Sequence, residues 1–331
     1  GARQMVWMEI FAGEKANART GEWISEDTFE ALREFKVGIK GPLTTPVGGG
    51  IRSLNVTLRL VLDLYSCIRP VRWIEGVPSP MKEPEKLDVI IFRENTEGMY
   101  GGVEFYPLPQ EVYDVLDRNH PKMKKFEKFG LENIAVSTRI MTRQGCENIV
   151  KRAFEYAKKF GRKSVTVVDK PNVLRETGGL MLRTAREVAK DYPDIPLWET
   201  NIDAQCMWLV KNPQDYDVIV AENMFGDILS DLAAQLVGGL GFACSANVGD
   251  DYAVFEPTHG SAPKYSGQYK VNPMAMLLTA KMMLEWLEEV DSAATLEDAV
   301  MEVIAEGKVK TYDMGGSDTS LQVAEAVAAK L

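Results

Sequence analysis

The 331-residue sequence predicts an α/β fold with a parallel sheet. Two observations lead to this prediction: short apolar runs alternate with longer amphipathic stretches, and most of the runs are continuously apolar. Continuous runs are typical of strands buried on both faces of a parallel sheet, and strand–helix alternation is typical of α/β proteins. The length fits two domains or one large α/β unit.

Four apolar runs are candidate strands, at residues 6–10, 88–92, 164–168 and 217–220. Six stretches have helical periodicity, at residues 26–35, 147–160, 227–240, 273–287, 296–306 and 319–330. Residues 98–139 are rich in aromatic, Pro, Lys and Glu residues and have no clear helical stripe. We expect this segment to be an insertion, a β-arm or an element exchanged between subunits.

The composition excludes several classes of protein. With 38 basic and 48 acidic residues the net charge is −10, which argues against nucleic-acid binding by net charge. No apolar run reaches the length of a membrane span, and the N-terminus carries no secretion signal. The four cysteines are far apart and there are only two histidines, which excludes a zinc ribbon and a His-rich metal site. We therefore expect reduced thiols and a cytoplasmic protein.

A group of arginines follows a glycine-rich stretch at residues 41–50, which is neither a GxGxxG motif nor a P-loop. Ser53, Asn55 and Arg59 fit one side of a short helical segment, and further arginines follow at Arg69, Arg72 and Arg93. Guanidinium groups bind carboxylates bidentately, so this group suits a small polycarboxylate. Surface ion pairing is the alternative, although Arg93 lies among apolar residues, where an unpaired guanidinium would be costly.

Two aspartates are spaced four residues apart, Asp227 and Asp231, which puts both carboxylates on one helix face. Like charges at this spacing repel unless a cation lies between them, and a hard divalent cation is the natural candidate. The alternative is that Asp227 caps the helix and Asp231 is solvated. Asp203 is a third candidate ligand.

Tyr100 and Lys170 are a workable acid–base pair, because a nearby ammonium lowers the pKa of a tyrosine. Residues 256–265 form a Gly-containing turn with His259, Lys264 and Tyr265 before a predicted helix. This turn suits an adenine nucleotide, and a solvated turn is the alternative.

As a set, these segments resemble the metal-dependent β-decarboxylating dehydrogenases, the isocitrate/isopropylmalate dehydrogenase family, and within it the members that oxidise isocitrate. The matching motifs occur in the family's order, at residues 40–45, 51–72, 93–100, 227–231 and 256–265. The resemblance implies a fold unlike the Rossmann fold, with large and small α/β domains, a central sheet and a dimer clasp. The implied boundaries are 1–64 with 238–331 for the large domain, 65–97 with 143–237 for the small domain, and 98–142 for the clasp.

The resemblance also implies a role for each candidate residue. Tyr100 and Lys170 match the catalytic acid–base pair. The positions that match substrate-binding residues are Thr45, Ser53, Asn55, Arg59, Arg69 and Arg93. The implied ligands of Mg²⁺ or Mn²⁺ are Asp203, Asp227 and Asp231. The implied cofactor contacts are Lys40, Thr44, Glu256, His259, Gly260, Lys264, Tyr265, Asn272 and Tyr312.

The implied activity is the metal-dependent oxidative decarboxylation of isocitrate to 2-oxoglutarate and CO₂, a reaction of the tricarboxylic acid cycle. The implied active unit is a homodimer in which Lys170 and Asp203 come from the partner subunit. No nucleic-acid or membrane partner is expected. The alternatives are a dehydrogenase for homoisocitrate or 3-isopropylmalate and a non-catalytic regulatory subunit. Ser53 and Asn55 argue against an isopropyl group, and the retained acid–base and metal residues argue against a regulatory subunit.

The expected cofactor is NADP, with NAD as the alternative. Lys264 and Tyr265 match the pair found in NADP-type members, whereas NAD-type members tend to carry Asp and an apolar residue there. Tyr312 matches a further 2′-phosphate contact, but the arginine that many NADP enzymes carry four residues later is Gly316 here. Family members also begin with a strand and a Gly-Asp-Gly-Ile-Gly loop. We therefore expect about 60 further N-terminal residues. Without a central strand the core would be exposed, and the free-energy cost would exceed the typical free energy of unfolding of a protein.

Overall fold

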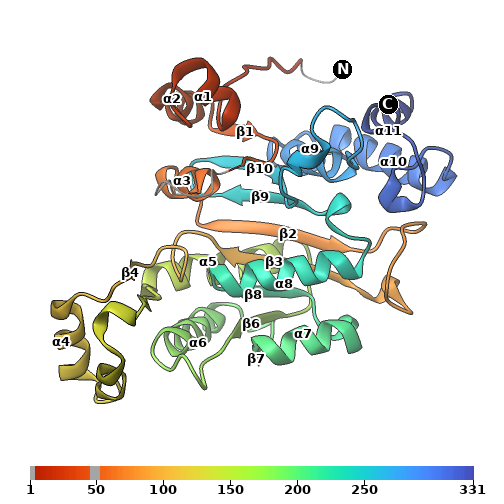
Figure 1. Cartoon of the computed structure of the whole chain (residues 1–331). Coiled ribbons are helices and arrows are strands. Elements are labelled where there is room, and N and C mark those ends of the chain that lie inside the picture. Colours follow the sequence, from red (N-terminus) through yellow and green to blue (C-terminus); the bar gives the residue numbers. More distant parts are fainter. Residues whose placement is uncertain (1–3, 45–52) are drawn as a thin grey trace.

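The computed structural model describes residues 4–44 and 53–331. A mixed sheet runs through the molecule in the strand order β1-β10-β9-β2-β3-β8-β6-β7 (Figure 1). Its strands are β1 (Val37–Ile39), β2 (Ser66–Arg72), β3 (Asp88–Glu94), β6 (Val165–Asp169), β7 (Leu197–Asn201), β8 (Val218–Ala221), β9 (Cys244–Val248) and β10 (Ala253–Pro257). A small second sheet pairs β4 (Glu104–Phe105) with β5 (Val136–Ser137).

Helices cover both faces of the large sheet. They are α1 (Glu14–Thr20), α2 (Glu26–Phe35), α3 (Leu54–Val61), α4 (Gln110–Asn119), α5 (Arg143–Lys159), α6 (Thr177–Val188), α7 (Ile202–Lys211), α8 (Asn223–Leu236), α9 (Met274–Trp286), α10 (Val290–Glu306) and α11 (Ser320–Ala328). All six helices predicted from periodicity are present, with ends shifted by a few residues. The α/β fold class is therefore confirmed.

Strand β3 shows why the apolar runs are continuous. Ile90 and Phe92 pack in a cluster with α5 and α6, whereas Val89 and Ile91 pack in a cluster with α7 and α8. All four side chains are buried. Since successive side chains of a strand point to opposite faces, a strand covered on both faces needs an apolar residue at every position.

The sheet is parallel only in part. Strands β3, β8, β6 and β7 run parallel, and β1 runs parallel to β10, but the β10–β9, β9–β2 and β2–β3 pairs are antiparallel. The predicted parallel sheet is therefore correct for one half of the molecule only. Strand β2 contains Pro70, which lies beyond the three residues that β9 pairs, so its missing N–H does not interrupt that ladder.

The strand predicted at residues 6–10 is wrong. These residues form no strand or helix, and the side chains of Val6, Trp7 and Met8 are 93 %, 66 % and 62 % exposed. A strand requires a hydrogen-bonded neighbour, and in the described part of the chain the edge strand β1 pairs with β10 alone. An apolar run without a partner strand remains extended coil.

The segment at residues 98–142 projects from the body of the molecule at the lower left of Figure 1. It contains the β4–β5 pair and, between these strands, helix α4, which was not predicted. Only Tyr113 of α4 is buried, but Val112, Val115 and Leu116 share its helical spacing, so the sequence did carry a signal for this helix. The segment exposes large apolar side chains, including those of Tyr106 and Phe129.

Removing the ring of Phe154 should strongly destabilise the protein. Phe154 is fully buried on α5 and stacks on Tyr192, with ring centroids 5.0 Å apart. We expect Phe154→Ala to lower the free energy of unfolding by about 3–5 kcal/mol, measured by urea denaturation at fixed protein concentration. The control is Phe160→Ala at the end of the same helix, where the side chain is 56 % exposed. Equal losses in the two variants would contradict the assigned core.

Candidate active site

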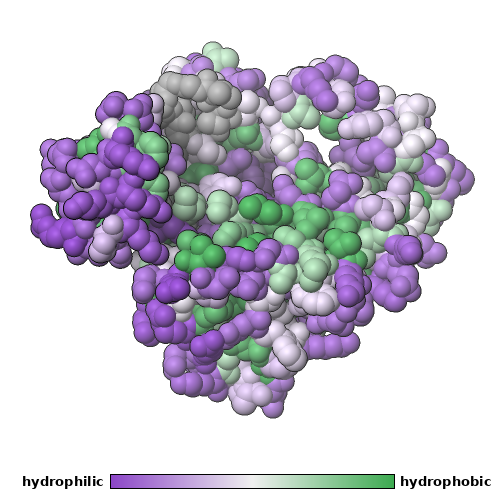
Figure 2. All heavy atoms as spheres, turned by 60° about the horizontal axis from the view of Figure 1, so that its bottom comes forward, coloured by the Kyte–Doolittle hydropathy of each residue, from purple (hydrophilic) through white to green (hydrophobic). Residues whose placement is uncertain are grey.

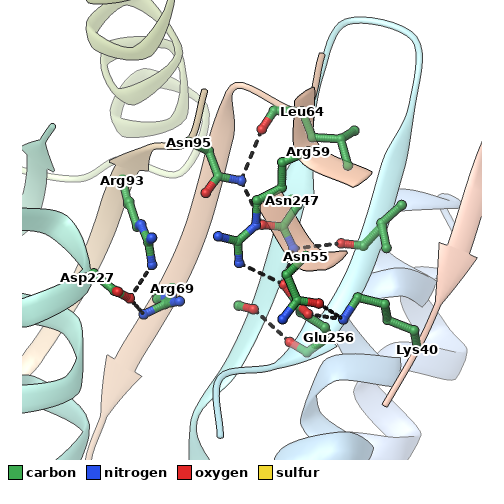
Figure 3. Close-up of polar contacts among 12 residues, drawn as sticks. Lys40, Asn55, Arg59, Leu64, Arg69, Arg93, Asn95, Asp227, Asn247 and Glu256 are labelled. Carbon is green, nitrogen blue, oxygen red and sulfur yellow. Dashed lines mark hydrogen bonds and ion pairs between the residues drawn. The ribbon is translucent and has the colours of Figure 1, made fainter. Parts of the chain in front are cut away.

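The polar residues named in the sequence analysis gather near the middle of the large sheet (Figure 3). Arg69 lies on β2, Arg93 on β3, Asp227 on α8 and Glu256 on β10. The register of β2 and β3 pairs Arg69 with Ile91 and Arg93 with Cys67. The two arginines are thus diagonal neighbours on one face of the sheet.

Glu256 organises the first part of the site. Its Oε1 accepts hydrogen bonds from Arg59 Nη2 at 3.0 Å and from Asn247 Nδ2 at 2.9 Å, and its Oε2 pairs with Lys40 Nζ. Lys40 also donates to Asn55 Oδ1 at 2.9 Å. Burial alone would raise the pKa of Glu256, but Lys40 and Arg59 lower it to about 2. Burial lowers the pKa of Lys40.

Asp227 organises the second part. Its Oδ1 accepts from Arg93 and, at 3.3 Å, from Arg69 Nη1. Arg69 Nη1 also donates to Ser230 Oγ at 2.6 Å and lies 3.5 Å from Asp231 Oδ1. Burial favours the protonated form of Asp227, but Arg93 and Arg69 outweigh it, so the pKa of this carboxyl is lowered.

The guanidinium of Arg93 is held rigidly inside the protein. Its Nε and Nη2 both donate to Asn223 Oδ1, at 2.9 Å and 2.8 Å, and only 2 % of the residue is exposed. Asn223 is the first residue of α8, and its Nδ2 donates to the carbonyl of Glu97 at 3.1 Å. The start of this helix therefore fixes the arginine, while the next turn supplies Asp227.

Tyr100 lies against this second part. Its hydroxyl donates to Asp227 Oδ2 at 2.7 Å, and the Arg93 guanidinium carbon lies 5.1 Å from its ring centroid. Burial and the hydrogen bond to Asp227 raise the pKa of Tyr100. In the single chain the hydroxyl donates to a carboxylate. The expectation that an ammonium lowers this pKa stays a prediction, because the resemblance takes that ammonium from the partner subunit.

Lys170 and Asp203 form a separate pair. Lys170 follows the end of β6, Asp203 lies in the first turn of α7, and the two side chains form an ion pair. Their side chains are 24 % and 67 % exposed. The hydrogen bond to Lys170 is the largest cause of the lowered pKa of Asp203. The chain thus presents Lys170 in one cluster and Tyr100 in another.

The metal ligands implied by the resemblance do not meet within one chain. Across residues 4–44 and 53–331, no three His, Cys, Asp or Glu side chains are grouped closely enough to hold a metal ion. Asp227 and Asp231 lie one helical turn apart with side chains 31 % and 55 % exposed, and burial raises the pKa of Asp231. Their carboxylate oxygens fit part of the ligand set of a hard divalent cation, with Asp203 left outside it.

Of the cofactor residues implied by the resemblance, Lys40 and Glu256 lie in the first part of the site, and the others lie in a second region. Thr44 Oγ1 and Ser261 Oγ are 2.6 Å apart, and His259 Nδ1 lies 3.0 Å from the Gly260 carbonyl. Both loops reach a cavity of about 760 Å³, which is also lined by α1, Tyr265 and Lys270. Thr45 lies outside the described residues.

The remaining cofactor candidates are held by side-chain contacts. The rings of Tyr265 and Tyr312 have centroids 5.8 Å apart, and Lys264 Nζ lies 4.8 Å from the Tyr265 centroid. Asn272 is buried, donates to Asp313 Oδ2 at 3.0 Å and accepts from the Met274 backbone N–H.

Ser53 lies at the start of α3, before the residues that contact the Glu256–Lys40 pair. It occupies the N-cap position of α3 and is half-buried, and its carbonyl accepts from the Thr57 backbone N–H at 2.9 Å. Asn55 and Arg59 both contact the Glu256–Lys40 pair, so α3 does present these residues on one side.

Sequence reasoning missed the amides that hold the charged groups. Asn95 Nδ2 donates to Asn247 Oδ1 at 2.9 Å, and Asn247 supports Glu256 in turn. Asn223 holds Arg93. All three asparagines are buried, and each lies within or shortly after a buried strand. An asparagine within or directly after an apolar strand was the signal in the sequence that could have identified these residues.

The Glu256 network makes the stability of the protein depend on pH. The pKa of Glu256 is about 2 in the folded protein and 4.5 in the unfolded chain. The contribution of its charge to the free energy of unfolding is therefore complete above pH 4.5. It is lost as the pH falls toward 2, and amounts to about 3 kcal/mol. We expect Glu256→Gln to lose about 3–5 kcal/mol of unfolding free energy at pH 7, because it leaves Lys40 and Arg59 without their anion.

The measurement is urea unfolding of wild type and variant at pH 7, 5 and 3.5, with Glu34→Gln on the exposed side of α2 as control. The difference between wild type and Glu256→Gln should shrink at pH 3.5, whereas the control should match wild type. A difference that stays constant between pH 5 and 3.5 would contradict the assigned charge state.

Comparison with known proteins agrees with this arrangement. The family model for isocitrate/isopropylmalate dehydrogenase matches residues 2–329. The isocitrate dehydrogenase (NADP) of Archaeoglobus fulgidus is 41 % identical, over 99 % of this chain and 85 % of its own length. That of Pseudomonas aeruginosa is 41 % identical, over 95 % of this chain and 80 % of its own length.

Solved structures give the same result. The isocitrate dehydrogenase of Methylococcus capsulatus superposes with a TM-score of 0.86 and 41 % identity, covering 96 % of this chain and 88 % of that one. The TT0538 protein of Thermus thermophilus has the same TM-score and 39 % identity, covering 97 % and 61 % of the two chains. The chain therefore belongs to the isocitrate/isopropylmalate dehydrogenase family.

Proposed function

We propose that this protein oxidises isocitrate with NADP and decarboxylates the product to 2-oxoglutarate. The observation that carries the proposal is the convergence of Arg59, Arg69 and Arg93, which are all buried within one site. Isocitrate bears three carboxylates, and guanidinium groups bind carboxylates through two parallel hydrogen bonds. The names of the relatives from Archaeoglobus and Pseudomonas support the same substrate and cofactor.

Polar groups favour isocitrate over 3-isopropylmalate. Ser53 and Asn55 stand at the edge of the arginine group, on the partly exposed side of α3. A carboxylate accepts hydrogen bonds from a hydroxyl and an amide, whereas an isopropyl group would leave both without partners. Substrate discrimination at this end of the site therefore rests on the first turn of α3.

The residues of the chain can divide the reaction between them. Asp227 and Asp231 would hold a divalent cation that polarises the oxygen on C2, and bound NADP would take up the hydride from C2 while the hydroxyl proton passes to a base. Arg69 and Arg93 neutralise the substrate carboxylates and stabilise the negative charge that develops as CO₂ leaves. Tyr100, whose raised pKa keeps its hydroxyl protonated, then donates a proton to the enolate carbon.

The active unit is a homodimer with shared sites. Tyr100 and Lys170 lie in separate clusters of one chain, so a second copy must bring a lysine to each tyrosine if the two act together. Figure 2 shows hydrophobic residues in a band across the middle of one face, where α7 and α8 lie. These helices expose Met207, Val210 and Ile228, each more than half accessible. An apolar patch of this kind is typical of a subunit interface.

The proposal also includes the domain boundaries and the cellular compartment. The large domain comprises residues 1–64 and 238–331, the small domain 65–97 and 143–237, and the clasp 98–142. The structure describes no helix long and apolar enough to cross a membrane. All four cysteines are free thiols, which supports the cytoplasm as the compartment.

The proposed reaction is tested by a four-way assay. Isocitrate and 3-isopropylmalate are each assayed with NADP and NAD, with Mg²⁺ and with excess EDTA. We expect the highest kcat/KM for isocitrate with NADP, and loss of activity in EDTA. A higher kcat/KM with 3-isopropylmalate or with NAD would overturn the proposed substrate or cofactor. Absence of activity in all combinations would favour a regulatory subunit.

Shared sites predict complementation between two inactive variants. Tyr100→Phe and Lys170→Met should each lower kcat by about 10²–10⁴-fold, because each removes one member of the acid–base pair. Mixed and allowed to re-pair at random, half of the dimers are heterodimers with one intact site of two. The mixture should therefore regain about a quarter of wild-type activity. Activity that stays at the level of the separate variants would rule out shared sites.

A further inference from the structure

Asn223 contacts two parts of the candidate active site at once. Its Oδ1 accepts hydrogen bonds from Arg93 Nε at 2.9 Å and Nη2 at 2.8 Å, and its Nδ2 donates to the Glu97 carbonyl at 3.1 Å. Asn223 is the first residue of α8, and only 1 % of it is exposed. An ionised aspartate can only accept hydrogen bonds, so both contacts together require an amide.

The Glu97 carbonyl belongs to the turn that carries Tyr100. The same oxygen accepts from the backbone N–H of Gly101 at 3.3 Å, so the turn closes around Tyr100. At the start of the turn, the Glu94 carboxylate accepts from the backbone N–H groups of Thr96 and Glu97, both at 2.8 Å. Because the turn is bonded within itself, a hydrogen bond to the Glu97 carbonyl positions the turn as a unit.

Two glycines allow α8 to approach this turn and strand β3 closely. Gly98 in the turn has a φ of 75°, and a Cβ there would lie 2.5 Å from Glu222 Oε2 and 3.3 Å from Asn223 Cβ. One turn further along α8, a Cβ at Gly226 would lie 2.7 Å from Arg93 Cβ. The start of α8 therefore packs directly on both elements, with the Asn223 amide bonded to each.

The other contacts of Tyr100 involve groups that the proposed reaction uses. Its hydroxyl donates to Asp227 Oδ2, and its ring lies 5.1 Å from the Arg93 guanidinium carbon. A hydroxyl that gives its proton to the substrate must turn away from Asp227. The hydrogen bond from Asn223 is made to the backbone and involves no reacting group, so it can hold the turn while the hydroxyl reacts.

We infer that Asn223 is a positioning residue that fixes Tyr100 relative to Arg93, so that the proton reaches one face of the substrate carbon. The inference rests on the proposed function and adds a residue to it. There, Arg93 orients a substrate carboxylate, and the Tyr100 O–H bond breaks as the C3–H bond of 2-oxoglutarate forms. One side chain holds both residues, and a displacement of about 1 Å between reacting groups can cost about 100-fold in rate.

The test compares two substitutions of Asn223 with a matched control. Asn223→Ala removes both contacts. Asn223→Asp keeps the acceptor for Arg93 but sets a carboxylate oxygen against the Glu97 carbonyl, so it releases the turn alone. The control is Asn148→Asp on α5, where Oδ1 accepts from Gln144 Nε2 at 2.6 Å, a contact that aspartate retains. Urea unfolding establishes that each variant is folded.

Three readouts separate the position of Tyr100 from that of Arg93. The first needs no turnover: 3-fluorotyrosine in place of Tyr100 gives a single ¹⁹F NMR resonance that reports its surroundings. The second is kcat and KM for isocitrate with NADP. The third is the position of deuterium at C3 after turnover in D₂O, read once the 2-oxoglutarate has been reduced enzymatically to glutamate, in which the two C3 hydrogens differ by NMR.

We expect both Asn223 variants to shift the ¹⁹F resonance and to lower kcat by about 10- to 100-fold. Both should place deuterium at either C3 position, because a displaced Tyr100 leaves the enolate to be protonated from solvent. Asn223→Ala should also raise KM, since Arg93 loses its support. The control should match wild type in all three readouts.

A higher KM with unchanged kcat and deuterium at one C3 position would mean that Asn223 supports Arg93 alone, and would overturn the inference. An unchanged ¹⁹F resonance in both variants would do the same. A wild-type protein that does not oxidise isocitrate would count against the proposed function, whereas the ¹⁹F resonance still decides whether Asn223 positions Tyr100.

Discussion

Two carboxylates, Glu256 and Asp227, carry the charge balance on which the whole site depends. Arg59, Arg69 and Arg93 are each less than a tenth exposed, and a guanidinium without an anion is costly in such a place. Glu256 pairs with Arg59, and Asp227 pairs with the other two. The arginines are therefore already paired and oriented before a substrate arrives, so little reorganisation is needed when an anion replaces or joins these partners.

The antiparallel pairing of β2 and β3 sets the positions of Arg69 and Arg93. Its register puts Arg69 and Arg93 two positions apart on one face, and α8 packs across that face. The first turn of α8 holds Arg93 through Asn223, and the next turns offer Asp227, Ser230 and Asp231. One helix therefore fixes two of the arginines proposed to bind substrate and also supplies carboxylates that suit a metal ion. A shift of α8 would disturb both at once.

The sequence predicted six of the eleven described α-helices and strands β3, β6 and β8 of the parallel half of the sheet, because their signals are local. Strands at 88–92, 164–168 and 217–220 are apolar on both faces, which their composition reveals. Strand β2 escaped prediction, since Ser66, Arg69 and Pro70 interrupt its apolar pattern while its pairing is with distant segments. The run at 6–10 has the opposite property: its composition suits a strand, but the described structure gives it no neighbour. Pairing, not composition, decided both cases.

The same holds for the site: the sequence shows which residue types are present, but not which residues contact one another. Motif spacing selected Arg69, Arg93 and Asp227, which the fold brings together, but it did not reveal which residues they contact. Their partners follow from sheet order, which places Arg59 beside Glu256 across 197 positions and Tyr100 beside Asp227 across 127. Burial is the main reason that the pKa of Tyr100 is raised in the single chain, and the Asp227 carboxylate delivered by α8 raises it further. A residue's chemistry can be proposed from its type, but the direction in which the fold tunes it requires knowing which distant segment lies beside it.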